Sequence, residues 1–317
     1  MDLPPFLVGP TGTGKTAVGV VLARAWSAEV LSVDSRQAYR GLDLATAKPT
    51  AAERAAAPHH LLDLFEPTEV ASAADFARRF HAALVEIRGR GRRALAVGGS
   101  GLYVDACLGR LDRLPPANPA IRAEHARILA TEGPGRLHAR LREVDPETAA
   151  RLAPADRQRI SRALEVYRLT GIPLSRLQTR GGPLDVRGAP PLVLLVRGRD
   201  DLRERIAVRA RTMLGAGLLE ELEAVLAAGV PADAPALQAI GCRDFVRLLR
   251  GETTREAALE AFVRRTQQYA KRQMTWFRNR YRGISPLDLA PEEPPETTAA
   301  RVRERLESRL TEAPEGA

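Results

Sequence analysis

The residues with the most definite chemistry form the stretch GPTGTGKT, residues 9–16. It fits the pattern G-x-x-x-x-G-K-[S/T], with an apolar strand pattern before it at 5–8 and a helical pattern after it at 17–26. In this context backbone N–H groups turn inward, and the start of the helix adds partial positive charge. We expect Lys15 to reach a terminal phosphate and the Thr16 hydroxyl to hold Mg²⁺. The predicted phosphate site consists of Gly9, Pro10, Thr11, Gly12, Thr13, Gly14, Lys15 and Thr16.

Two more polar residues directly follow predicted strands. Asp34 comes after the apolar run at 29–33, and Ser100 lies in the turn GGSG after the apolar run at 94–97. Ligands of parallel sheets lie beyond the carboxyl ends of the strands, so one site can collect Gly9, Asp34 and Ser100. Asp34 can cap a helix or assist Mg²⁺ binding, or it can act as a general base beside the phosphates. The residue types alone leave these alternatives open.

Arginines at helical spacing are further candidates for anion binding. Arg205 and Arg209 lie four residues apart on one predicted helix, where they can clamp a diphosphate. Arg159 and Arg162 lie three residues apart on another predicted helix, opposite an apolar stripe. For this second pair a solvated charged face is the ordinary interpretation.

The charge balance favours a polyanionic partner. The chain of 317 residues has a formal net charge of +9 and a pI near 10.3. Near its end, residues 264–282 interleave Tyr269, Trp276, Phe277 and Tyr281 with basic side chains. Basic residues follow phosphates and flat rings stack on bases, so this helix predicts contact with RNA.

Several classes of protein are disfavoured. Cys107 and Cys242 are too few for a disulfide framework or a zinc knuckle. His59 and His60 lack a third ligand at suitable spacing, so we interpret them as a hydrogen-bonded loop pair rather than a metal site. No segment reads as a membrane span or a signal peptide, and we expect a cytoplasmic protein without membrane contact.

The alternation of apolar strands with helices predicts an α/β fold, a parallel sheet core of the P-loop type flanked by helices. Residues 116–189 show charged helical patterns punctuated by Pro and Gly, and no apolar strand pattern. We therefore expect an all-helical domain to be inserted there. We place the first part of the core at 1–115 and its second part, with basic C-terminal helices, at 190–285. Residues 286–297 read as a loop, and 286–317 as a partly flexible tail.

Several motifs together resemble one family. GPTGTGKT, VDSRQAY, TAKP, HHLLD, GGSGLY, RALEVYRLTG, AIG and QYAKRQMTWFR occur in the order seen in bacterial-type tRNA dimethylallyltransferases, also called tRNA isopentenyltransferases. The resemblance runs from about residue 7 to 282. It implies transfer of a dimethylallyl group from dimethylallyl diphosphate to the N6 amine of the adenosine just 3′ of the anticodon, in tRNAs that read codons starting with U. Mg²⁺ is the implied cofactor.

The resemblance also implies roles for single residues. The phosphate loop and Arg209 hold the diphosphate as the leaving group, while Asp34 and Ser100 are catalytic, with Asp34 as the base. The helical insertion grips the anticodon stem-loop of the tRNA, and neither a membrane nor an obligate protein partner is implied, which fits a monomer. The implied tRNA contacts are Asp34, Ser35, Arg36, Gln37, Ser100, Arg122, Gln158, Arg159, Ile160, Ser161 and Arg162.

The chain departs from the family pattern at three places. Ser100 stands where Thr is usual, CRD at 242–244 where Tyr-Lys-Glu is common, and Gln267 where Arg is frequent. Two other enzymatic functions stay open: prenylation of free adenine nucleotides, as in adenylate isopentenyltransferases, and a small-molecule kinase with an arginine lid. A GTPase-like RNA-binding switch is a weaker alternative, because the chain has no N-K-x-D motif.

Overall fold

The structure, a computed structural model, describes residues 2–178, 182–186, 190–284 and 286–311. The chain forms two compact units, one of Met1–Gly109 with Pro183–Ala317 and one of Arg110–Gly182. We call the first the core unit and the second the helical unit. Among the described residues no helix is long and apolar enough to cross a membrane.

The core unit is built on a parallel sheet of six strands in the order β3-β2-β4-β1-β6-β8, which confirms the predicted fold class. Gly98 at the end of one strand is in register with both Val8 and Val33 at the ends of its two neighbours. The three loops that follow these strands therefore begin side by side at one edge of the sheet. The strands are β1 (Phe6–Val8), β2 (Ala28–Val33), β3 (His59–His60), β4 (Arg93–Gly98), β6 (Leu192–Arg197) and β8 (Pro286–Leu289).

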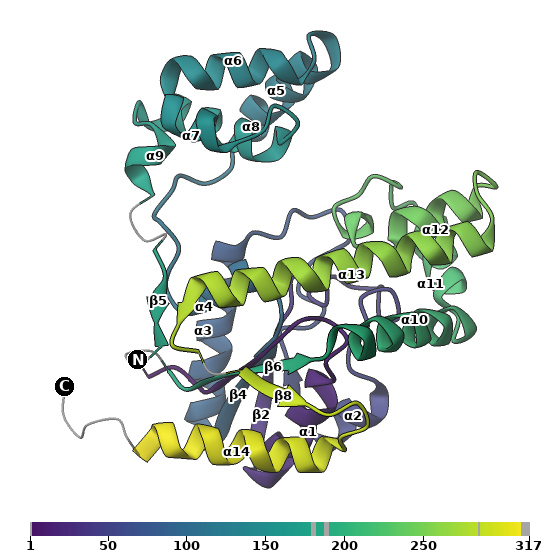
Figure 1. Cartoon of the computed structure of the whole chain (residues 1–317). Helices are drawn as coiled ribbons and strands as arrows, with labels where there is room; N and C mark the ends of the chain where they lie inside the picture. The colour runs from purple at the N-terminus through teal and green to yellow at the C-terminus, as the bar shows by residue number, and fades with distance from the viewer. Residues whose placement is uncertain (1, 179–181, 187–189, 285, 312–317) are drawn as a thin grey trace. The chain divides into compact units, whose positions relative to one another are not determined.

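Helices cover both faces of this sheet (Figure 1). One face packs on α1 (Lys15–Ala25) and α14 (Pro295–Thr311). The strands are apolar on both sides because both faces are buried. The apolar core on the other side of the sheet contains residues of α3 (Ala73–Gly89), α4 (Gly101–Cys107), α10 (Arg199–Gly215), α11 (Leu218–Ala227), α12 (Cys242–Leu249) and α13 (Arg255–Arg280). The remaining short elements of this unit are α2 (Ala51–Ala56), η2 (Ala236–Gln238), β5 (Leu184–Asp185) and β7 (Tyr281–Arg282).

The prediction for the C-terminal segment was wrong. Pro286–Leu289 is the edge strand β8, which pairs with β6, and α14 packs against α1. Only every second residue of this strand, Leu287 and Leu289, is buried, so the segment lacks the continuous apolar run by which the other strands are recognised. Residues 312–317 of the predicted tail lie outside the described residues.

The helical unit is all-helical over its described residues, as predicted. Its helices are α5 (Pro119–Thr131), α6 (Pro134–Val144), α7 (Pro146–Arg151), α8 (Arg157–Thr170) and α9 (Leu174–Leu177), around a small apolar core of their own. The compact unit spans 110–182, against the predicted 116–189. The boundary differs because Leu184–Asp185 forms strand β5, which pairs with β7 of the core unit.

Candidate active site

The phosphate loop connects β1 to α1 in the predicted way. Gly12 and Gly14 have φ of 87° and 91°, left-handed values that favour glycine. Because Gly14 is the N-cap, no side chain occupies the first amides of α1, and these amides are available to an anion. The Thr13 hydroxyl and the Lys15 ammonium both donate to the Pro10 carbonyl, at 2.9 and 2.7 Å.

A cavity of about 110 Å³ lies against this loop. Its lining includes Gly14, Lys15 and Thr16 of the loop together with Asp34 and Arg209. Burial lowers the pKa of Lys15 from 10.5 to about 7, with Asp34 opposing and Arg209 adding to the shift. The small cavity thus gathers backbone amides, two cationic side chains and hydroxyl groups, a set suited to a phosphate chain. Arg205, the other predicted clamp residue, instead donates to the Gly12 carbonyl at 3.1 Å.

A second cavity of about 430 Å³ adjoins the first. It is lined by residues of α10, of α13 and of the loop after β2, with apolar and polar side chains from both helices. The larger cavity includes the apolar side chains of Ile206, Met213 and Phe262 and the polar side chains of Tyr269 and Arg272. Six residues line both cavities, which places them at the junction: Thr11, Gly12, Asp34, Thr46, Ala47 and Arg209.

Asp34 is fixed at this junction by the turn that it starts. One of its carboxylate oxygens accepts the Arg36 N–H at 2.8 Å. Ser35 and Arg36, two of the predicted tRNA contacts, line the larger cavity beside it. Gln37, a third predicted tRNA contact, lines the smaller cavity instead. There its side chain bridges the Ser32 hydroxyl at 2.7 Å and the Ala47 carbonyl at 2.9 Å.

Ser100 is buried and does not itself line either cavity. Its hydroxyl oxygen accepts the Ser35 N–H at 3.1 Å and lies 3.3 Å from the Ser35 hydroxyl. Tyr269 also forms a hydrogen bond with Ser100, and burial followed by the Asp34 charge raises the pKa of that phenol. The structure thus joins Ser100 to two residues of the larger cavity wall.

The long helix α13 supplies a residue that sequence reasoning missed. Gln273 is buried and contacts both glycine loops: its Oε1 accepts the Thr11 N–H at 2.9 Å, and its Nε2 donates to the Gly99 carbonyl at 2.8 Å. A Cβ on Gly101 would meet the ring of Trp276 at 2.3 Å. The turn GGSG therefore makes close approaches to other parts of the protein. Three- and four-residue spacing places Tyr269, Gln273 and Trp276 on one face of α13, but this spacing does not reveal what that face contacts.

The aromatic cluster of α13 divides between two roles. Phe277 and Tyr281 are core residues, and the Tyr281 hydroxyl bonds to Asp105 at 2.6 Å. They are not available to RNA, which corrects the interpretation of the whole cluster as an RNA surface. Tyr269 and Arg272 do line the larger cavity.

The two histidines form strand β3 rather than a loop, but both are hydrogen-bonded as predicted. His59 Nδ1 lies 2.8 Å from the Ala57 carbonyl, and His60 Nε2 lies 2.6 Å from Glu29. In the described part of the chain no group of three or more His, Cys, Asp or Glu is placed to hold a metal ion.

In the helical unit, the predicted tRNA contacts differ in their exposure to solvent and in whether they already have a partner within the protein. Arg159 and Gln158 are exposed at the start of α8. Arg122 and Arg162 pair with the buried Glu165, at 3.0 and 2.5 Å. Burial raises the pKa of Glu165, but hydrogen bonds from these two arginines and from the Asn118 N–H, with the charge of Arg122, together hold it below its usual value.

Two other predicted contacts of α8 point into the helical unit. Ile160 is 1% exposed and belongs to the apolar core, so its side chain is not available to tRNA and that prediction is corrected. The Ser161 hydroxyl lies 2.8 Å from His125 Nδ1. Both placements follow from the position of these residues around α8, because one face of this helix is buried against its neighbours.

Fold and site together define a P-loop α/β protein with an anion pocket that opens into a larger cavity. The model of a family described as "IPP transferase" matches residues 37–280. A tRNA dimethylallyltransferase of Halorhodospira halophila is 45% identical, covering 88% of this chain and 90% of the relative, and one of Methylibium petroleiphilum is 48% identical, covering 86% and 85%. The crystal structure of the tRNA isopentenylpyrophosphate transferase of Bacillus halodurans superposes with a TM-score of 0.68 at 34% identity, covering 98% and 99%. The chain belongs to the IPP transferase family.

Proposed function

We propose that this protein transfers a dimethylallyl group from dimethylallyl diphosphate to tRNA. The acceptor is the N6 amine of the adenosine immediately 3′ of the anticodon, in tRNAs that read codons starting with U. The observation that carries the proposal is the position of Asp34, which lines both the anion cavity and the larger cavity. A carboxylate at this junction can meet an amine on one side and the carbon attached to a diphosphate on the other.

This arrangement supports the following reaction. The N6 lone pair forms a bond to the first carbon of the donor, the bond from that carbon to the diphosphate oxygen breaks, and Asp34 takes the N6 proton. Negative charge grows on the departing diphosphate. The amides of the phosphate loop, Lys15 and Arg209 face that charge before the reaction starts, so they stabilise the transition state without rearranging.

The smaller cavity fits a Mg²⁺ ion that is held mainly through the diphosphate. Thr16 and Asp34 offer hard oxygen ligands there, and Mg²⁺ commonly takes one or two protein ligands beside phosphates and water. We propose that the Thr16 hydroxyl holds the ion, which when bound neutralises charge on the leaving diphosphate.

An adenine within a stacked anticodon loop cannot reach Asp34. We therefore propose that the adenosine is extruded into the larger cavity, at a cost of a few kcal/mol. The cavity of about 430 Å³ presents polar groups of Ser35, Arg36 and Tyr269 to the base. The helical unit, with the exposed Arg159 at the start of α8, adds electrostatic contact with the stem-loop.

The direct test is mass spectrometry of tRNA after incubation with the protein, dimethylallyl diphosphate and Mg²⁺. A dimethylallyl adduct on the adenosine 3′ of the anticodon, without nucleoside triphosphate, is the expected result. A parallel reaction with AMP separates this function from that of an adenylate prenyltransferase. Prenylated AMP with unmodified tRNA, or consumption of ATP with unmodified tRNA, would overturn the proposal.

Two further properties belong to the same proposal. We expect the chain to act as a monomer, since one core unit carries the whole anion pocket. We also expect it to act in the cytoplasm, where its tRNA substrate is found. Analytical ultracentrifugation with and without tRNA checks the first, and fractionation of cells checks the second.

A further inference from the structure

The loop of residues 43–48 forms the wall where the two cavities meet. Thr46 and Ala47 line both of them. The Ala47 carbonyl accepts from Gln37 Nε2 at 2.9 Å and from Arg209 Nη2 at 3.4 Å. This single carbonyl therefore orients two side chains of the anion pocket.

Ala47 holds that carbonyl in an unfavourable backbone conformation. Its φ of 53° lies in the left-handed region, which is unfavourable for a residue with a Cβ. Such a conformation persists only where its surroundings fix it. The position of the carbonyl thus depends on contacts that the rest of the loop makes.

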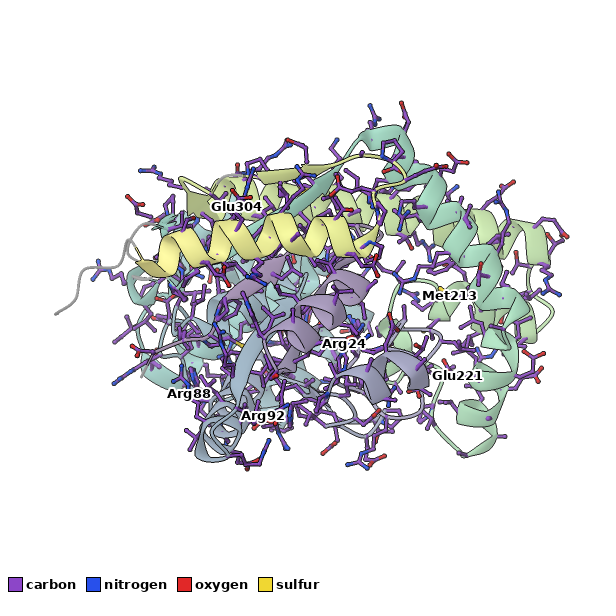
Figure 2. All side chains as sticks on the ribbon, turned by 90° about the horizontal axis from the view of Figure 1, so that it is seen from below. Arg24, Arg88, Arg92, Met213, Glu221 and Glu304 are labelled. Carbon is purple, nitrogen blue, oxygen red and sulfur yellow. The ribbon has the colours of Figure 1, made fainter. Side chains whose placement is uncertain are left out.

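Two charged side chains supply those contacts. Lys48 is buried, and its ammonium binds Asp43 at 2.6 Å and Asp63 at 2.5 Å. The second is Glu221, which lies in the first turn of α11 (Figure 2). Its carboxylate accepts three consecutive backbone N–H groups, those of Asp43 and Leu44 at 2.7 Å each and of Ala45 at 2.8 Å.

The three backbone N–H groups of residues 43–45 point at one side chain, so that side chain must act only as a hydrogen-bond acceptor. A carboxylate offers two oxygens with about four lone-pair positions, whereas an amide side chain replaces one oxygen with a donor. Bonds to an ionised acceptor are also about twice as strong as neutral ones. Glu221 matches this segment in both respects.

We propose that Glu221 is a positioning residue of the anion site. It fixes the amides of residues 43–45 and thereby sets the Ala47 carbonyl that orients Arg209 and Gln37. This inference rests on the proposed function only for the identity of the bound diphosphate. The anion pocket and the position of Arg209 in it are observed in the structure itself.

Glu221→Gln and Glu221→Ala test this inference against Glu220→Gln as the matched control. Glu220 is exposed in the same first turn of α11, so its change removes the same charge from the same helix end. The measurements are calorimetric binding of inorganic diphosphate with Mg²⁺, the KM values for dimethylallyl diphosphate and for an anticodon stem-loop, and thermal unfolding.

Glu221→Ala is expected to weaken diphosphate binding and raise the donor KM at least tenfold. Glu221→Gln should cause a smaller loss in the same direction, while the KM for RNA changes less than twofold in both. Glu220→Gln should match wild type. If Glu221→Ala unfolds below the assay temperature, the diphosphate binding and donor KM of Glu221→Gln alone test the inference.

Wild-type diphosphate binding in a folded Glu221→Gln or Glu221→Ala protein would overturn the inference, and so would equal rises in the KM for donor and for RNA. Failure of the proposed function is a separate result. In that case wild type leaves tRNA unmodified, while the diphosphate affinities still show whether Glu221 positions the site.

Discussion

The side-chain oxygen of Gln273 accepts a hydrogen bond from the backbone N–H of Thr11 at 2.9 Å, although 262 positions separate them in the chain. Its side-chain nitrogen donates to the Gly99 carbonyl at 2.8 Å. One buried amide therefore joins α13 to the phosphate loop and to the turn after β4. Through these two bonds the last third of the chain fixes the geometry of a loop near its start.

Gln273→Leu should destabilise the protein and weaken donor binding. The change leaves the half-buried Thr11 N–H and the buried Gly99 carbonyl without their Gln273 partner, and one unpaired buried polar group costs about 1–3 kcal/mol. We expect the free energy of unfolding in urea to fall by about that amount and the KM for dimethylallyl diphosphate to rise. Gln268→Leu is the control, because Gln268 is exposed on the same helix. A Gln273→Leu protein with wild-type stability and KM would contradict this role.

Asp34→Asn separates binding from chemistry. Asparagine can still accept the Arg36 N–H that shapes the turn, so the loop should keep its form. It cannot take a proton from the acceptor amine. We expect single-turnover prenylation to fall by about 10²–10⁴ while the affinities for both substrates stay near wild type. Rapid-quench measurement of one turnover is the decisive assay, and a wild-type rate would exclude Asp34 as the base.

The meeting of the three loops at one sheet edge could be predicted from the sequence. Gly9 and Asp34 each directly follow an apolar run, and parallel strands end at a common edge. Pairing of Gly98 with Val8 and Val33 confirms this. Such reasoning works because it needs only local patterns and one general property of parallel sheets.

Residues whose role depends on distant packing could not be found in this way. Gln273 is one polar residue within a strongly basic segment, and only the docking of α13 brings it to Thr11. The contacts of Glu221 with residues 43–45 likewise join segments that no short motif connects. Ile160 shows the opposite error, because family resemblance assigned it to tRNA although its place on the apolar stripe of α8 predicts burial.

Arg159 and Arg162 should respond differently to removal. Arg159 is 74% exposed, so Arg159→Ala should weaken tRNA binding and lower the slope of log affinity against log salt by about 1, with unchanged stability. Arg162→Ala removes a partner of Glu165, whose side chain is fully buried, and should lower thermal stability instead. Filter binding over a salt series, with calorimetric melting of each variant, checks both. Equal effects of the two changes on stability would refute the distinction.

Lys15 should make diphosphate binding dependent on pH. Its pKa falls from 10.5 in the unfolded chain to about 7 in the folded protein, mainly through burial. Between these values the unfolded chain binds more protons, so the free energy of unfolding of the ligand-free protein should rise with pH across this window. A bound diphosphate favours the charged ammonium and raises this pKa again. Above pH 7 binding should therefore take up to one more proton in wild type than in Lys15→Met.

Calorimetric titration with dimethylallyl diphosphate at pH 8, in two buffers of different ionisation enthalpy, measures that difference in protons. Comparison with Lys15→Met removes the contribution of the ligand's own titration, since both proteins bind the same anion. The stability part of the prediction is checked by urea unfolding between pH 7 and 10, where the wild-type curve should rise relative to that of the variant. Equal proton uptake by the two proteins would show that Lys15 does not gain a proton on binding, and a parallel pair of stability curves would show that folding does not lower its pKa.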